Sequence, residues 1–139
     1  MRKSRLNKNS QREVAKLIKK LDRCLSKLTL ERDKNEGCIT SGVKTGIFHA
    51  GHFRRRSLMS TRFHPQNVNK QSARDNTFLY GREYEYGLAL DRKFGEGTAR
   101  KLYELSRKTR QWTADELRVL ISACEKGHLV YSEIYSKLR

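Results

Sequence analysis

Apolar positions near the start of the chain recur every three or four residues, which is the spacing of one helix face. They are Val14, Leu17, Ile18, Leu21, Cys24, Leu25 and Leu28. Ser10 and Glu13 stand just before them in the order of a capping box, in which each side chain bonds the other residue's backbone amide. The pattern predicts a long N-terminal amphipathic helix over residues 10–30, preceded by a disordered basic arm at residues 1–9.

The next part of the chain changes its pattern. Asp, Asn and Gly residues interrupt the apolar spacing as in a loop, with a short strand expected over residues 38–43. Residues 47–53 and 68–71 are candidates for two antiparallel strands, and residues 74–94 return to a helical spacing. The buried positions expected in that helix are Phe78, Leu79, Tyr86, Leu88 and Leu90. The segment 38–94 is therefore predicted to form a β-β-α unit.

Further helices are expected toward the C-terminus, over residues 98–139. Thr98 is placed to cap a short helix, and Thr113 with Glu116 forms a second capping box. A chain of 139 residues suits one domain better than two well-packed ones. These patterns together predict an α+β fold, with a single domain over residues 10–139.

The net charge of the chain limits the classes of binding partner to consider. The chain has 31 Lys and Arg against 15 Asp and Glu, a formal charge of +16. An excess of this size is most simply explained by a polyanion, with nucleic acid first and an anionic membrane surface second. No apolar run approaches the roughly 18 residues of a spanning helix, and no apolar segment follows the basic N-terminus. We therefore expect a soluble, unprocessed protein without a membrane partner.

Cysteine use agrees with an intracellular protein. Cys24, Cys38 and Cys124 are odd in number and widely spaced, so they do not indicate a disulfide framework. Cys24 and Cys124 fall on apolar faces of predicted helices and are expected in the core.

The β-β-α segment carries residues suited to phosphodiester hydrolysis. His52 offers a general base, because neutral imidazole accepts a proton near physiological pH. Asn76 offers an oxygen to a hard cation such as Mg²⁺, and Asn67 can hold the loop near His52 by hydrogen bonds to its backbone. The same spacing also fits a phosphate-contacting surface histidine and turn-forming asparagines. His64 and His128 are expected to be surface residues.

Basic residues surround this segment and are expected to clamp phosphates on either side of the scissile bond. Arg62 is alternatively an internal residue that pairs with Asp75 or Glu85. A cluster of like charges in a loop has no evident role in folding, which favours DNA contact for the triple arginine. The predicted DNA contacts are Arg54, Arg55, Arg56, Arg62 and Lys70.

Several anchors in order give the chain a resemblance to a known family. The string AGHFRRRSLMSTRFHPQNVNKQSARDN at residues 50–76, followed by Gly81 and the run Glu85-Tyr86-Gly87, resembles the HNH-type endonucleases of the NinG/Rap recombination family of lambdoid phages and prophages. That family reads approximately C-x-x-C, A-G-H-[FY], T-R-F, N-[VI]-x-x-Q-C-x-x-C-N. The resemblance runs from about Cys38 to the helix begun at Trp112-Thr113.

The resemblance implies a His-Me finger (β-β-α-metal) nuclease that uses Mg²⁺ or Mn²⁺. In it His52 is the general base, Asn67 braces the finger, and Asn76 is a metal ligand. His49 stands near the place where many HNH enzymes have an acidic metal ligand, and is expected to replace it. The implied substrate is branched or recombination-intermediate DNA such as a Holliday junction, in the cytoplasm of a phage-infected bacterium. Symmetric cutting of a junction needs two active sites, so a homodimer joined through the N-terminal helix is also expected.

The chain departs from the family where two C-x-x-C pairs hold a structural zinc. It has Cys38-Ile39-Thr40-Ser41 and Ser72-Ala73-Arg74-Asp75, so one thiolate of four remains and no structural zinc is predicted. The aromatic residues between 78 and 86 and the N-terminal helix are expected to compensate by packing. A non-catalytic DNA-binding protein with a degenerate HNH finger and a basic RNA- or ribosome-associated protein are the alternatives.

Overall fold

A computed structural model of the chain describes residues 7–128. It has α-helices and one small antiparallel sheet, so the predicted α+β class is confirmed. The elements are α1 (Lys8–Arg32), β1 (Phe48–His52), the 3₁₀ turn η1 (Pro65–Asn67), β2 (Val68–Ser72), the π-helical turn η2 (Arg74–Phe78), α2 (Glu83–Phe94), α3 (Thr98–Ser106) and α4 (Ala114–Glu125).

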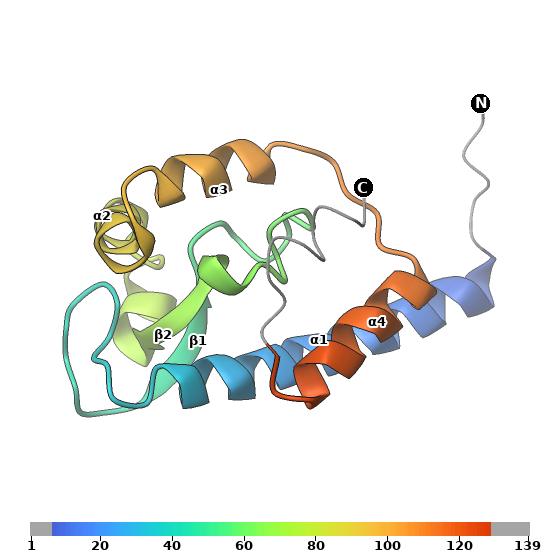
Figure 1. Cartoon of the computed structure of the whole chain (residues 1–139), viewed down its shortest axis with the longest axis horizontal. Coiled ribbons are helices and arrows are strands. Elements are labelled where there is room, and N and C mark those ends of the chain that lie inside the picture. The colour runs from blue at the N-terminus through green and yellow to red at the C-terminus, as the bar shows by residue number, and fades with distance from the viewer. Residues whose placement is uncertain (1–6, 129–139) are drawn as a thin grey trace.

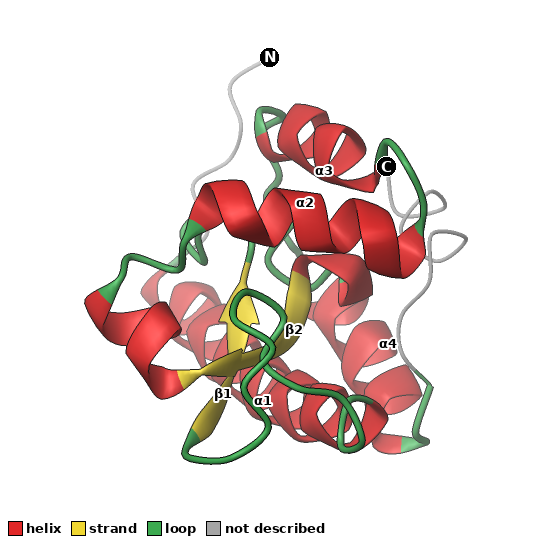
Figure 2. Ribbon diagram, turned by 90° about the vertical axis from the view of Figure 1, so that its left-hand side faces the viewer, coloured by secondary structure: helices red, strands yellow, loops and turns green. Residues whose placement is uncertain are grey.

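The long helix α1 forms the base of the fold (Figure 1). α4 lies alongside it, and both strands also contact it. α2 packs on the opposite side of the two strands, with α3 beside it (Figure 2). The β-hairpin is therefore enclosed between α1 and α2.

α1 begins earlier than its apolar pattern predicts. The side chain of Asn7 accepts the backbone N–H of Ser10 at 2.8 Å and caps the helix, so the predicted Ser10–Glu13 capping box is wrong. Asn is among the best N-cap residues, and the helix begins two residues earlier than predicted, at Lys8, as a result. Residues 7–9 thus belong to an ordered helix start, and the rest of the predicted basic arm, residues 1–6, lies outside the described residues.

The two predicted strands are confirmed to within one residue at each end. They pair antiparallel with Ala50 opposite Lys70 and His52 opposite Val68. The strand predicted over residues 38–43 is wrong. Cys38 donates its N–H to the Val43 carbonyl at 2.8 Å, which closes a local turn instead of a ladder.

The helix predicted over residues 74–94 is interrupted. η2 ends at Phe78, and the next three residues after Leu79 have positive φ angles: 52° at Tyr80, 77° at Gly81 and 47° at Arg82. A left-handed backbone cannot continue an α-helix. Tyr86 and Leu90 are buried as expected, whereas the expected burial of Phe78, Leu79 and Leu88 is wrong: Phe78 and Leu79 precede the left-handed turn, and Leu88 lies on the exposed side of α2.

The C-terminal helices follow their capping signals in part. Thr113 and Glu116 form both bonds of the predicted capping box at the start of α4. Gly97, not Thr98, caps α3, because Thr98 is already helical and its hydroxyl donates to the Gly95 carbonyl at 2.7 Å. Two helices, α3 and α4, are present in the described part of the segment 98–139, where C-terminal helices are predicted. The tail from residue 129 lies outside the described residues.

The main core lies between α1, α4 and the hairpin, and uses the apolar stripe of α1. Its buried residues are Leu21, Leu25, Phe63, Val68, Trp112, Leu117, Leu120, Ile121 and Cys124, with Cys24 packed at its edge. The apolar stripe of α1 therefore packs within the chain, and the expected homodimer stays a prediction. No helix in residues 7–128 is long and apolar enough to cross a membrane.

Candidate functional site

His52 ends β1 with its ring held in one orientation. Its Nε2 lies 3.0 Å from the Arg62 backbone carbonyl. A carbonyl only accepts hydrogen bonds, so Nε2 carries the proton and Nδ1 is the basic nitrogen of the neutral ring. Burial lowers the pKa of His52, Arg56 and Arg62 lower it further, and the Arg62 carbonyl and Asp22 act in the opposite direction. The net lowering keeps the imidazole neutral at physiological pH.

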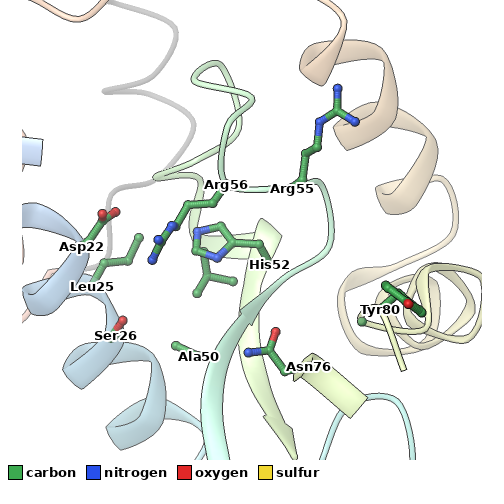
Figure 3. Close-up of a pocket in the computed structure, with 11 residues that line it drawn as sticks. Asp22, Leu25, Ser26, Ala50, His52, Arg55, Arg56, Asn76 and Tyr80 are labelled. Atoms are coloured by element: carbon green, nitrogen blue, oxygen red, sulfur yellow. The ribbon is translucent and has the colours of Figure 1, made fainter. Parts of the chain in front are cut away.

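Two cavities of about 300 and 250 Å³ meet at His52. The residues that line both are His52, Arg55, Tyr80 and Gly81. Figure 3 shows the larger cavity, with the His52 ring between residues of α1 and the Asn76 side chain. The histidine therefore faces space that a ligand can enter from outside the core.

Asn67 fastens the loop that follows β1, as expected from its spacing to His52. Its Oδ1 accepts the Arg54 N–H at 2.8 Å, and its Nδ2 donates to the Arg54 carbonyl and to the Thr61 carbonyl, both at 3.1 Å. The side chain is fully buried, so the three bonds are shielded from water. Asn67 thus fixes the backbone on the C-terminal side of His52 without reaching into the cavity.

Asn76 and His49, the two expected metal ligands, contact one another. Asn76 Nδ2 lies 3.2 Å from His49 Nδ1, and the Asn76 oxygen lies on the His52 side of the carboxamide in Figure 3. Gly51 makes this approach possible. A Cβ added there would lie 3.1 Å from Asn76 Oδ1 and 2.2 Å from Gln71 Oε1.

These oxygens fit a hydrated Mg²⁺ or Mn²⁺. Asn76 Oδ1 is a neutral oxygen donor, and the buried Gln71 Oε1 beside the same glycine has no hydrogen-bond partner within residues 7–128. Mg²⁺ prefers oxygen ligands and keeps several waters, so a single protein oxygen is compatible with it. No cluster of three or more His, Cys, Asp or Glu that could hold a metal occurs among the described residues.

Tyr86 couples α2 to the strand that carries His52. Its hydroxyl donates to the Gly51 carbonyl at 2.6 Å and accepts from Asn69 Nδ2 at 3.2 Å. Burial raises the pKa of Tyr86, so the hydroxyl keeps its proton for this bond. α2 is thereby fixed against the residue immediately before His52.

Two of the five predicted DNA contacts are engaged inside the fold. The Arg54 side chain bonds Ser106, pairs with Glu83 and lies over the Tyr103 ring. A role in folding is thus evident for this member of the triple arginine, contrary to expectation. Its guanidinium ties the loop after β1 to α2 and α3.

Arg62 is internal, as its alternative interpretation held, but its partner is on α1. Asp22 receives both Nε and Nη2 of Arg62, at 3.1 and 2.5 Å. Asp75 and Glu85, the partners expected for it, are instead within ion-pair distance of Arg82. Asp22 therefore holds the residue whose carbonyl orients His52.

Arg55 and Arg56 remain available to a ligand. Both are exposed, both line the larger cavity, and neither forms an ion pair within the described part of the chain. Lys70 is less free, since its Nζ donates to the Glu36 carbonyl at 2.8 Å and lies over the Phe48 ring. The cationic side of the site is thus centred on the two arginines.

His64 is not the surface residue that was expected. Its Nδ1 accepts the Gln66 N–H at 3.2 Å and caps η1. Burial lowers the pKa of His64 to about 4. His128 is exposed, as expected.

Comparison with known proteins assigns the chain to a family. A family model described as Bacteriophage Lambda NinG protein matches residues 1–129. The chain belongs to the NinG family. Curated relatives named Protein ninG, from Enterobacteria phage H19B and Escherichia phage 933W, are each 27% identical over 105 residues, or 74% of this chain and 52% of the relative. The chain thus spans about half the length of these relatives, and no solved structure matches it.

NinG membership agrees with the phage setting that the resemblance implied. The positions where the resemblance places zinc cysteines lie close together in the fold. Cys38 Sγ accepts the Ser72 N–H at 3.1 Å and lies 3.8 Å from Asp75 Oδ2, which the Thr40 hydroxyl bonds at 2.5 Å. Burial raises the Cys38 pKa, but hydrogen bonds from Ser41, Thr40 and Ser72 outweigh it and bring the pKa to about 7.

One thiol among hydroxyls and an already bonded carboxylate does not fit a tetrahedral zinc site. Hydrogen bonds connect these positions directly. Of the elements expected to compensate by packing, Tyr86 and α1 are packed in the core, whereas Phe78, Tyr80 and Tyr84 are exposed. The prediction that the chain has no structural zinc stays a prediction.

Sequence reasoning missed Asp22 and Tyr80 as residues of the cavity. A signal for Asp22 was present: it is the one acidic residue between Glu13 and Glu31, on a helix otherwise rich in lysine. Tyr80 had no such signal, because its position depends on the interruption between η2 and α2.

Proposed function

We propose that this chain is a divalent-metal-dependent DNA endonuclease with a His-Me finger core, acting on branched or recombination-intermediate DNA. The orientation of His52 carries the proposal. A neutral imidazole with a lowered pKa, protonated on Nε2 and basic on Nδ1, lines a cavity together with Asn76, Arg55 and Arg56, and neither arginine forms an ion pair within residues 7–128. NinG membership and the A-G-H, T-R-F and N-V-x-x-Q anchors support it.

His52 acts as the general base. Nδ1 takes a proton from a water molecule as the water oxygen forms its bond to phosphorus, and the bond from phosphorus to the leaving oxygen breaks on the opposite side. The positive charge that develops on the ring is shared with the Arg62 carbonyl at Nε2. Asn67 and Asp22 maintain this geometry from either end of the loop after β1.

Arg55 and Arg56 bind the phosphates that flank the scissile bond, because a guanidinium can contact two phosphate oxygens at once. Asn76 would hold a divalent cation through Oδ1, with His49 orienting the carboxamide. When bound, such a cation stabilises the negative charge that develops on the phosphate and the leaving oxygen.

The pH dependence of cleavage tests the base directly. Because the pKa of His52 lies below its ordinary value of 6.5, kcat/KM should rise with pH through an acidic pKa and be level by neutral pH. If kcat/KM still rises between pH 7 and 8, a group other than His52 is responsible for the rise.

Cleavage of Holliday junction, nicked and linear DNA with Mg²⁺ tests the function. His52→Ala should abolish cleavage and leave binding intact, while His128→Ala, a change at an exposed histidine, should cleave as wild type does. If the wild-type protein binds these DNAs and cuts none of them with Mg²⁺ or Mn²⁺, the non-catalytic DNA-binding alternative replaces the proposal.

A further inference from the structure

The turn between η2 and α2 displays aromatic side chains that the fold does not use. Phe78, Tyr80 and Tyr84 are 74%, 96% and 77% exposed. Neither tyrosine hydroxyl forms a hydrogen bond within residues 7–128. Three exposed aromatic rings within seven residues are costly to keep in water, so they indicate a surface that meets a partner.

The backbone of this turn is strained and firmly held. Tyr80 and Arg82 have φ angles of 52° and 47° on either side of Gly81, in a region that side chains with a Cβ rarely adopt. The Gly81 N–H donates to the Asp75 carbonyl at 2.7 Å, and the Gly81 carbonyl accepts from Gln71 Nε2 at 2.8 Å. Such strain persists where surrounding bonds enforce it, and it occurs preferentially at functional sites. Tyr80 is thus presented by a fixed support.

Tyr80 faces the same space as the candidate base. It lines both cavities with His52 and Arg55, and Figure 3 shows it across the larger cavity from Asp22 and Arg56. The turn that carries Tyr80 therefore borders the cavity in which a phosphate would lie between His52 and the arginines.

We propose that the aromatic turn, residues 78–84, stacks on an unpaired base of the DNA strand whose phosphate enters the His52 cavity. An aromatic ring stacks on the face of a base, and in a continuous duplex neighbouring base pairs cover those faces. The net charge of +16 and the free Arg55 and Arg56 favour a polyanion over an apolar protein segment. The ligand class is DNA with unstacked nucleotides, as at a gap, flap or branch point, and its identity as a substrate rests on the proposed nuclease function.

Binding without metal separates this inference from the chemistry. The probes are a flush duplex and the same duplex with a three-nucleotide gap in one strand. In the gapped probe, 2-aminopurine is one of the unpaired bases opposite the gap, and both probes are used in EDTA. Tyr80→Leu should weaken binding to the gapped DNA by roughly tenfold and leave the duplex affinity nearly unchanged, and it should lessen the fluorescence change of 2-aminopurine. Tyr80→Trp should restore both, and Val119→Ala, an exposed apolar residue on α4, should have no effect.

The charge and folding controls use the same probes. Arg55→Ala should weaken binding to both DNAs alike and reduce the salt dependence. Tyr80→Leu should keep the wild-type melting temperature, because the side chain is almost fully exposed. Equal affinity of Tyr80→Leu and wild type for the gapped DNA, or an equal loss for both DNAs, would overturn the inference. Conversion of a dimer to a monomer by Tyr80→Leu in sedimentation would also overturn it, because the turn would then bind a second copy.

The two proposals fail in different ways. Loss of cleavage in His52→Ala together with unaltered gap binding in Tyr80→Leu would retain the nuclease and reject the stacking site. Selective loss of gap binding in Tyr80→Leu, with no DNA cut by the wild-type protein, would retain the stacking site and reject the nuclease.

Discussion

Asp33, at the end of α1, joins three parts of the fold through one buried carboxylate. Arg32 donates to its oxygens through Nε at 2.7 Å and Nη2 at 2.8 Å, and Lys93 of α2 donates at 2.9 Å. The Lys70 N–H of β2 adds a fourth bond at 3.1 Å. Replacement of Asp33 by Asn keeps the shape of the side chain and removes its charge.

The expected loss of stability follows from the cations that remain. Removing one partner of a buried ion pair costs roughly 3–5 kcal/mol. Arg32 and Lys93 are 21% and 17% exposed, and both also donate to Asn69 Oδ1, so the lower end applies. We expect Asp33→Asn to reduce the free energy of unfolding by about 3 kcal/mol, a large part of the roughly 5–15 kcal/mol of an ordinary domain.

Urea unfolding followed by circular dichroism and by fluorescence of the buried Trp112 measures this loss. Asp115→Asn is the matched control, because Asp115 is 95% exposed and its ion pair within residues 7–128 is with Arg118 on the surface. That change should alter the unfolding free energy by less than about 0.5 kcal/mol.

The loss should depend on pH in a defined direction. Burial raises the pKa of Asp33, but hydrogen bonds from Arg32 and Lys93 outweigh it and lower the pKa below its ordinary value. The stabilisation by Asp33 is therefore complete above the unfolded pKa of about 4 and is lost as pH falls through the folded pKa. A loss under about 1 kcal/mol at pH 7, or one that stays constant in acid, would refute this account of the network.

Three further predictions concern the hairpin. Tyr86→Phe should lower the free energy of unfolding by about 1–3 kcal/mol, because the Gly51 carbonyl loses a buried donor; an unchanged urea midpoint would contradict this. Gly51→Ala should lower the melting temperature and reduce cleavage, since the new Cβ would lie 2.2 Å from Gln71 Oε1; wild-type values for both would contradict it. His64 is neutral in the fold with a pKa of about 4, below its unfolded value, so its contribution is complete above pH 6.5 and about 3 kcal/mol is lost by pH 4. His64→Asn should flatten this acid decline in melting temperature, and an identical slope would contradict the assignment.

Local signals in the sequence predicted local structure well. The candidate segments 47–53 and 68–71 matched both strands, and the Thr113 capping box placed the start of α4. The contacts of Asn67 with the Arg54 backbone also followed from spacing to His52. Each of these depends on residues that are neighbours in sequence or in one hairpin.

Partners that are distant in sequence were not predictable in this way. Arg62 pairs with Asp22, 40 residues away, and Lys93 with Asp33, 60 residues away. The helical spacing of residues 74–94 was real, but the left-handed turn at Gly81 overrode it. Long-range ion pairs and backbone reversals depend on the assembled fold, so a linear pattern does not contain them.

The position of α1 has a consequence for how this fold can be reused. Asp22, Leu25 and Ser26 of that helix form a wall of the His52 cavity, although the segment 38–94 contains every residue proposed to act on DNA. A fragment limited to residues 38–94 would lack that wall and the partner of Arg62. The segment 38–94 therefore cannot be transferred on its own: a graft into another scaffold must include α1, and a chimera between family members must exchange α1 and this segment together.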